Sequence, residues 1–277
     1  MPHYLIVIVL YGKCLSESSS ICSLMASGNL LQGRCRLIVW DNSPTPCHPE
    51  EIESLQNRIG LALDYRHNQG ENVPLSALYN RTIPLLSEGE MLVILDDDSV
   101  FDADLFTKAD QAIHTYPDAD LFLPVVRNGK DIVSPAAMVG FKGHYLQEVQ
   151  PGPMPCHHRT AINSGMIISA RYLKHEFEGY DERIRFYFTD NDFMSRFTAS
   201  HQQFIVLDYT VQHTLNFYAR GEDFETKSRR LRELRRSFLI LMRRRGILAY
   251  LSTWLYLVVY SIKFAIIQRD VRYIFVM

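Results

Sequence analysis

The sequence predicts an α/β protein built on an open, mostly parallel sheet, and three observations support this prediction. Over the first 125 residues, short apolar runs rich in β-branched residues alternate with segments of helical periodicity. Polar turns such as residues 41–44 follow the apolar runs directly, as expected at the carboxyl edge of such a sheet. The chain has 277 residues, of which 47% are hydrophobic, enough for a full-sized core.

The elements of the first half follow in order from the amino terminus. Residues 4–10 form an uninterrupted apolar run without the basic region or cleavage site of an export signal, so we expect a buried central strand. The further elements expected are a helix over 16–31, strands over 36–40 and 61–65, a helix over 74–86 broken or kinked at Pro84, a strand over 91–95, a helix over 102–116 and a strand over 121–125. Residues 129–209 are less regular, and we expect them to shape the site of a second substrate.

Charge divides the chain into two parts. The whole sequence has a formal net charge of −2, but residues 1–226 carry −12 and residues 227–277 carry +10. We therefore expect an acidic globular domain over 1–226, with halves at 1–125 and 126–226, and a basic tail with a different partner. The five cysteines are odd in number and widely spaced, which indicates reduced thiols in a cytosolic protein.

Three consecutive aspartates, Asp96, Asp97 and Asp98, follow the strand expected at 91–95. Burying an unpaired carboxylate costs several kcal/mol, so these side chains either face solvent or hold a cation. In an extended segment Asp96 and Asp98 lie on the same side, where both can face one divalent ion and the phosphates it carries. The alternative is a solvated turn in which Asp98 or Ser99 caps a helix.

A second acidic pair, Asp190 and Asp192, lies among aromatic residues. An aromatic setting lowers the local dielectric constant and raises the pKa of a carboxyl group, which suits a general base. We expect Asp190 to be the base and Asp192 to orient it or to cap the following helix. The alternative is that Asp190 or Asp192 only caps the following helix. His213, taken alone, is typical of an ordinary core or surface histidine.

Together these motifs resemble the family 2 glycosyltransferases of the GT-A fold, in particular the bacterial rhamnosyltransferase-like branch, over residues 4–215. The first strand with its Tyr-Gly ending, the Val-Trp-Asp-Asn-Ser segment at 39–43, the Asn-x-Gly segment at 68–70 and the D-x-D motif at 96–98 follow in the family's order. The resemblance implies a GT-A fold and a nucleotide-sugar donor. The residues it places at the donor are Tyr11, Asp41, Asn68, Gly70, Asn80, Asp96 and Asp97.

The same resemblance implies the catalytic, metal and acceptor residues. It makes Asp190 the catalytic base, although Thr189 replaces the family's usual acid, and it makes Asp98 and His213 the ligands of Mg²⁺ or Mn²⁺. The residues it places at the acceptor are Asn163, Ser164, Gly165 and Asp192. The implied reaction is an inverting transfer, in which the base takes the proton of an acceptor hydroxyl as that oxygen attacks the anomeric carbon.

The basic tail contains two different segments. Residues 227–245 carry eight arginines and one lysine between apolar residues at helical spacing, which is typical of an amphipathic helix on anionic lipid. Nucleic acid is the competing partner. Against it, the rest of the chain is strongly acidic and contains no recognisable nucleic-acid-binding motif. Residues 247–267 carry one charge and could span a bilayer. Their aromatic residues are scattered, so we favour interfacial helices, with a span or packing on the domain as alternatives.

The resemblance therefore implies an inverting transferase that moves a sugar from a UDP- or dTDP-sugar to a lipid-linked or cell-envelope saccharide. It would work at the cytoplasmic face of the inner membrane, as a peripheral or monotopic protein, with residues 227–267 on the anionic surface. Two alternatives stay open. A metal-dependent nucleotidyltransferase would need a phosphate loop after the first strand, and residues 11–14 make a poor one. A non-catalytic scaffold that docks on membranes is the other.

Overall fold

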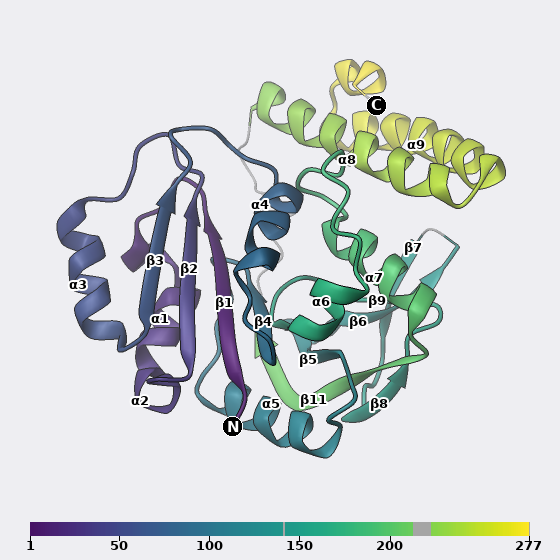
Figure 1. Ribbon diagram of the computed structural model, residues 1–277. Coiled ribbons are helices and arrows are strands. Elements are labelled where there is room, and N and C mark those ends of the chain that lie inside the picture. Colours follow the sequence, from purple (N-terminus) through teal and green to yellow (C-terminus); the bar gives the residue numbers. More distant parts are fainter. Residues whose placement is uncertain (141, 213–222, 277) are drawn as a thin grey trace.

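The structure is a computed structural model that describes residues 1–140, 142–212 and 223–276. One 11-stranded sheet has helices on both faces, and two long helices lie at one end of the molecule (Figure 1). The main path of the sheet has the order β3-β2-β1-β4-β10-β5-β11-β8. The bounds along this path are β3 Ala62–His67, β2 Cys35–Asp41, β1 His3–Leu10, β4 Glu90–Leu95, β10 Met166–Ser169, β5 Leu121–Asn128, β11 Gln203–Gln212 and β8 Gly152–Pro155.

The strand pairing is mixed and mostly parallel in the first half, as predicted. β3, β2, β1 and β4 pair in parallel, and β10 runs antiparallel between β4 and β5. β11 then pairs in parallel with β5. Three further strands leave the main path beside β5: β6 Asp131–Val139, β7 Lys142–Leu146 and β9 Arg159–Thr160. The region that looked irregular in the sequence therefore supplies the second half of the same sheet.

Both faces of the sheet are covered, which explains the uninterrupted apolar run of β1. Leu5 and Val7 belong to the core on one face, whereas Tyr4, Ile6 and Ile8 belong to the core on the other. The helices on the first face are α4 Leu75–Thr82, α6 Ala170–His175 and α7 Thr189–Ser200. Those on the second face are α1 Ser19–Ala26, α3 Pro49–Ile59 and α5 Asp104–Thr115.

Several predicted helices differ from the observed ones. The helix predicted over 16–31 is divided into η1 Leu15–Glu17, α1 and α2 Gly28–Leu31, and the Ser18 side chain caps α1 by accepting from the Ile21 amide. The break predicted at Pro84 in the helix over 74–86 is confirmed: α4 ends at Thr82 and η2 Ile83–Leu85 follows, because Pro84 cannot donate a backbone hydrogen bond. Helix α3 was not predicted; it buries little more than Leu55 and Ile59.

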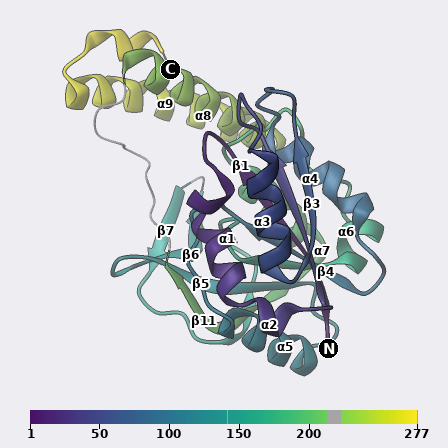
Figure 2. The same ribbon diagram turned by 90° about the vertical axis from the view of Figure 1, so that its left-hand side faces the viewer.

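The tail forms an antiparallel helical hairpin across the carboxyl edge of the sheet (Figures 1 and 2). Its elements are α8 Phe224–Arg244, α9 Ile247–Gln268 and η3 Val271–Phe275. Leu231, Phe238, Leu257 and Phe264 form a core within the hairpin, and Ile184 of the first domain joins it. Both helices also contact the sheet region: the Phe238 ring of α8 stacks on Phe188, and Lys142 of β7 lies over the Tyr256 ring of α9. By length and composition, α9 is the one helix among the described residues that could cross a membrane.

Candidate active site

The carboxyl ends of β1, β2 and β4 border a cavity of about 550 Å³, which we call the donor cavity. Tyr11 follows β1, Asn42 follows β2 and Asp97 follows β4, so the parallel pairing brings these three residues to one edge. Parallel α/β sheets bind ligands at this edge, and the volume lies in the range of small-molecule sites. The structure thus places the predicted donor residues Tyr11 and Asp97 in one cavity.

A second cavity of about 250 Å³, the base cavity, adjoins the donor cavity. Leu75, Phe186 and Tyr187 line both of them. Asp96 and Asp190 line the base cavity, so the fold brings together two carboxylates that are 94 positions apart in the sequence. A ligand that occupies both cavities would therefore pass from the strand ends to the start of α7.

Asp190 lies in the first turn of α7, directly after Phe188 and Thr189. Phe188 has a left-handed backbone conformation, φ 69°, and this sharp turn leads the chain into the helix at the cavity wall. Burial is the main cause that raises the pKa of the Asp190 carboxyl to about 7, and the Asp96 carboxylate across the cavity contributes to this rise. The Asn191 amide donates a 2.8 Å hydrogen bond to Asp190 Oδ1, which opposes the rise. Asp190 therefore has the pKa of a general base.

The predicted acceptor segment Asn163-Ser164-Gly165 connects the two carboxylates. Ser164 Oγ donates a hydrogen bond to Asp96, and Asn163 Nδ2 donates one of 3.1 Å to Thr189 Oγ1, next to the base. Gly165 has φ 80°, and a Cβ there would lie 2.7 Å from Pro124 Cγ, so no larger residue fits without displacement. Asn163 also lines the base cavity. This segment positions both acidic groups.

The D-x-D segment has partners within the protein. Lys13 Nζ lies 2.8 Å from Asp97 Oδ2, whereas Asp98, the next residue, is not among the residues that line the donor or the base cavity. Among the described residues, no three His, Cys, Asp or Glu side chains form a group that could hold a metal ion. The predicted second ligand, His213, lies outside the described residues. The acidic strand end offers oxygen ligands of the kind that Mg²⁺ and Mn²⁺ prefer.

Asp41, Asn68 and Gly70 shape the loops around the donor cavity. The buried Asp41 carboxylate accepts hydrogen bonds from the Ser43 amide and from Tyr65, and these outweigh burial and hold its pKa below the ordinary value. Asn68 Nδ2 donates a 2.7 Å hydrogen bond to Asn42 Oδ1. Gly70 has φ 80°, and a Cβ there would lie 3.1 Å from the Pro44 carbonyl oxygen. None of the three predicted residues is among those that line the donor cavity.

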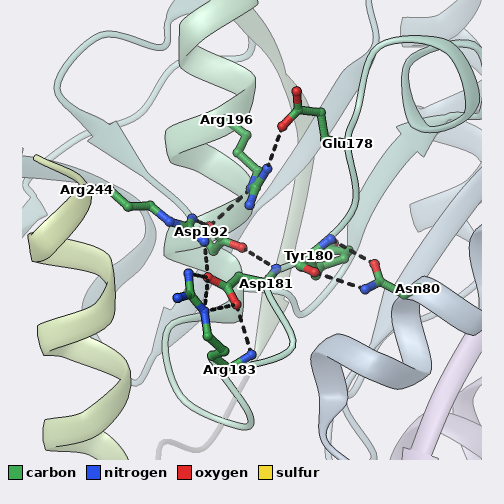
Figure 3. A network of polar contacts seen from close by, with 8 residues as sticks. All are labelled: Asn80, Glu178, Tyr180, Asp181, Arg183, Asp192, Arg196 and Arg244. Atoms are coloured by element: carbon green, nitrogen blue, oxygen red, sulfur yellow. Dashed lines mark hydrogen bonds and ion pairs between the residues drawn. The ribbon is translucent and has the colours of Figure 1, made fainter.

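Asn80 and Asp192 belong to a network of polar contacts that joins α4, the loop before α7, α7 and α8 (Figure 3). Asn80 accepts a 2.8 Å hydrogen bond from the Tyr180 amide and donates one of 3.0 Å to its carbonyl. The Asp192 side chain is 1% exposed and accepts from the Asp181 amide, Arg196 and Arg244. Neither residue lines the donor or the base cavity. Asn80 instead contacts the loop before α7, and Asp192 joins α7 to α8 through Arg244.

The sequence interpretation missed the part of the tail that reaches the site. Four residues at helical spacing on α8 line the donor cavity, namely Thr226, Arg229, Arg230 and Glu233. Arg185, from the loop before α7, lines it too. The i, i+3, i+4, i+7 spacing marks one face of a helix in the sequence, but only packing tells which surface that face covers. Part of the basic charge assigned to a membrane therefore borders the donor cavity.

Comparison with known proteins gives similarity in structure alone. No family model and no curated protein sequence matches the chain. The S. aureus TarS fragment 1–349 matches with a TM-score of 0.60 and 14% identity, over 92% of this chain and 79% of that one. This chain spans 39% of the length of the longer TarS structure. The mannosyltransferase PcManGT from Pyrobaculum calidifontis matches with a TM-score of 0.55 and 15% identity, over 93% of this chain and 70% of that one.

GalNAc-T7 also matches, with a TM-score of 0.55 and 12% identity over 84% of this chain and 47% of that one. At identities of this size the similarity concerns the fold. The predicted fold class is confirmed: a mixed, mostly parallel sheet flanked by helices, in the GT-A arrangement of these glycosyltransferases, followed by a carboxyl-terminal helical hairpin.

Proposed function

We propose that this chain is an inverting glycosyltransferase that moves a sugar from a UDP- or dTDP-sugar to a hydroxyl of a lipid-linked or cell-envelope saccharide. The observation that carries the proposal is Asp190, a carboxyl group with a pKa of about 7 that lines a cavity next to the donor cavity of a GT-A fold. Similar structures are described with UDP-GlcNAc, in TarS, and with GDP-Man and Mn²⁺, in PcManGT. The motif order over residues 4–215 supports the rhamnosyltransferase-like branch.

The two adjoining cavities divide the work of the reaction. The donor cavity holds the nucleoside diphosphate between the strand ends and α8, and the base cavity holds the transferred sugar and the acceptor hydroxyl. Asp190 accepts the hydroxyl proton while the oxygen attacks the anomeric carbon and the bond to the diphosphate breaks. Attack from the side opposite the leaving group inverts the anomeric configuration. Asp96, held by Ser164, supports the transferred sugar or the ribose.

The charge of the leaving diphosphate requires cations in the donor cavity. Asp98 and His213 would hold Mg²⁺ or Mn²⁺, which neutralises the departing phosphates when bound. Arg185, Arg229 and Arg230 add positive charge from the loop before α7 and from α8. The donor would therefore lie between acidic residues of the sheet edge and basic residues of the tail.

We also propose that the hairpin holds the enzyme at the cytoplasmic face of the inner membrane as a peripheral or monotopic protein. Along one side of α9 the exposed residues are Leu248, Leu251, Leu255, Val259, Ile262 and Ile266, which we call the α9 stripe. Apolar surface of this kind next to a run of arginines suits the interface of an anionic bilayer. A lipid-linked acceptor would be met at that surface.

The test is the substitution Asp190→Asn in the full chain. A screen of nucleotide sugars with Mn²⁺ first identifies a donor by slow hydrolysis or by calorimetric binding. We expect donor turnover to fall by about 10² to 10⁴-fold, the usual contribution of a general base, while donor affinity stays within about twofold. Asp208→Asn is the control, because this exposed carboxylate pairs with Lys108 on the far side of β11. Near-normal turnover in Asp190→Asn would remove Asp190 from the role of base.

A further inference from the structure

A third cavity, of about 350 Å³, lies between the first domain and the hairpin, and we call it the tail cavity. Lys142 and Gly143 of β7 form one side, and Phe188 forms the end nearest α7. The hairpin supplies the rest, including Phe238 of α8 and Tyr256 of α9. The cavity therefore exists only because α8 and α9 pack against the sheet domain.

The tail cavity adjoins the base cavity. Phe188 and Leu234 line both, and Phe188 lies two positions before Asp190. The Phe188 ring stacks on Phe238, with centroids 4.9 Å apart and an angle of 14° between the planes. A ligand held in the tail cavity would thus end beside the proposed base, on the side away from the donor cavity.

The lining of the tail cavity combines apolar groups with one cation. Its walls carry the rings of Phe188, Phe238, Tyr256 and Tyr260, and none of the described residues that line it is acidic. Lys142 Nζ lies 4.6 Å from the centroid of the Tyr256 ring, which holds the ammonium group against this wall. Such a lining suits a molecule with an anionic group next to an apolar chain.

The position of α9 indicates where that molecule comes from. Tyr256, Leu257 and Tyr260 of α9 line the cavity, while Leu255 and Val259 on the other side of the same helix are exposed in the α9 stripe. The cavity and the stripe are therefore separated by one helix, about 10 Å across. A chain rising from a lipid surface beneath the stripe would reach the cavity within that distance.

We propose that the tail cavity binds the lipid-phosphate end of a lipid-linked acceptor. Lys142 contacts the phosphate, the aromatic walls contact the first carbons of the chain, and the attached saccharide extends past Phe188 toward Asp190. This inference rests on the proposed function and narrows it, because it selects a lipid-linked acceptor over a free saccharide. It assigns acceptor residues that lie in β7 and in the hairpin.

The probe for the test is decyl phosphate below its micellar concentration, titrated into the full chain by calorimetry. We expect binding that Lys142→Ala weakens by about tenfold, the effect of one charge-assisted contact, and that Lys142→Arg largely retains. Tyr260→Ala should weaken it as well. Leu255→Ser, which alters the stripe, and Lys108→Ala, which removes a remote lysine, are the matched controls and should leave the affinity unchanged.

Inorganic phosphate lacks the alkyl chain and decyl maltoside lacks the phosphate, so the two probes test these groups separately. Both should bind at least tenfold more weakly than decyl phosphate. Equal affinity for decyl phosphate and decyl maltoside, or an affinity that Leu255→Ser reduces and Lys142→Ala does not, overturns the inference. Donor binding with Mn²⁺ is measured on the same samples. Donor binding without decyl phosphate binding refutes the acceptor site alone, whereas absent donor binding refutes the proposed function.

Discussion

The two helices of the hairpin have nearly the same length, 21 residues in α8 and 22 in α9, and follow each other across Gly246, yet they present opposite surfaces. The basic helix α8 is the inner one: it borders the donor, base and tail cavities. The apolar helix α9 is the outer one, with the stripe exposed along its length. Charge and apolarity in the sequence favoured a membrane surface for both helices and did not indicate that α8 would border the cavities.

The difference has a physical cause in what each helix packs against. Arg244 of α8 donates to the buried Asp192 and to Asp181, so an acidic pocket of the domain holds the basic helix (Figure 3). Asp192 is 1% exposed and also pairs with Arg196, so the two arginines together compensate this buried carboxylate. In contrast, α9 buries Leu257 and Phe264 in the hairpin core and leaves the α9 stripe exposed. The domain thus holds α8, and the α9 stripe is left for another partner.

The largest expected effect concerns the stripe. Replacing both Leu251 and Leu255 by Glu removes two leucines from any lipid contact, each worth about 1.5–3 kcal/mol, so vesicle binding should fall by more than about 100-fold. Cosedimentation with phosphatidylglycerol vesicles measures this. Donor turnover in solution should stay near normal, because the stripe borders none of the three cavities.

The control for the stripe is Leu30→Glu, since Leu30 is also an exposed leucine, in α2, remote from the hairpin. It should leave vesicle binding unchanged. Undiminished cosedimentation of the stripe variant would contradict the role of α9 as the lipid-facing helix.

The next effect concerns the inner helix. Arg229→Gln and Arg230→Gln each remove a positive charge from the donor cavity, so the KM for the nucleotide sugar should rise by about tenfold, with a smaller change in kcat. Steady-state kinetics over a range of donor concentrations measures the two constants. Vesicle binding should change by less than the KM does, which separates α8 from α9.

Arg232→Gln is the matched control for these arginines. Arg232 is exposed on α8, does not line the donor cavity and donates to the Ser228 carbonyl. If Arg232→Gln raises the KM as much as Arg229→Gln does, the effect comes from the general charge of the tail and the assignment to the donor cavity is wrong.

Much of the fold could be predicted from local patterns. The first four strands of the sheet were located within about two residues, because apolar runs such as 4–10 are buried on both faces and leave a clear signal. The second half could not be predicted in this way. There β10, only Met166–Ser169, gains its place from its pairing with β4 and β5, which connects residues far apart in the sequence.

The residues of the candidate site likewise divide into those with a local sequence signal and those placed by long-range contacts. Asp96, Asp97 and Asp190 could be proposed from local sequence because strand ends and helix starts carry local signals, and the structure places all three at the cavities. The partners of Asp192 could not be predicted from local sequence, because its ion pair with Arg244 joins positions 52 residues apart. Similarly, nothing in the arginine pattern of α8 indicates that Arg229 and Arg230 face the donor cavity.

The smallest expected effect concerns the pKa of the base. Leu234 of α8 lines the base cavity, and burial is the main cause that raises the pKa of Asp190 to about 7. Asp190 must be deprotonated to accept a proton, so turnover should rise with pH and level off above about 7. Leu234→Ser admits water, lowers the pKa of Asp190 and shifts this acid limb to lower pH.

The shift is measured as the pH of half-maximal kcat/KM, and Leu255→Ser on α9 is the matched control. Leu234→Ser should move the acid limb by a few tenths of a pH unit up to about one pH unit, and Leu255→Ser should not move it. Asp96 faces the same cavity and also raises the pKa, so Asp96→Asn should shift the limb in the same direction. An acid limb that stays in place in Leu234→Ser, but moves in Asp96→Asn, would mean that charge repulsion rather than burial by α8 sets the pKa of the base.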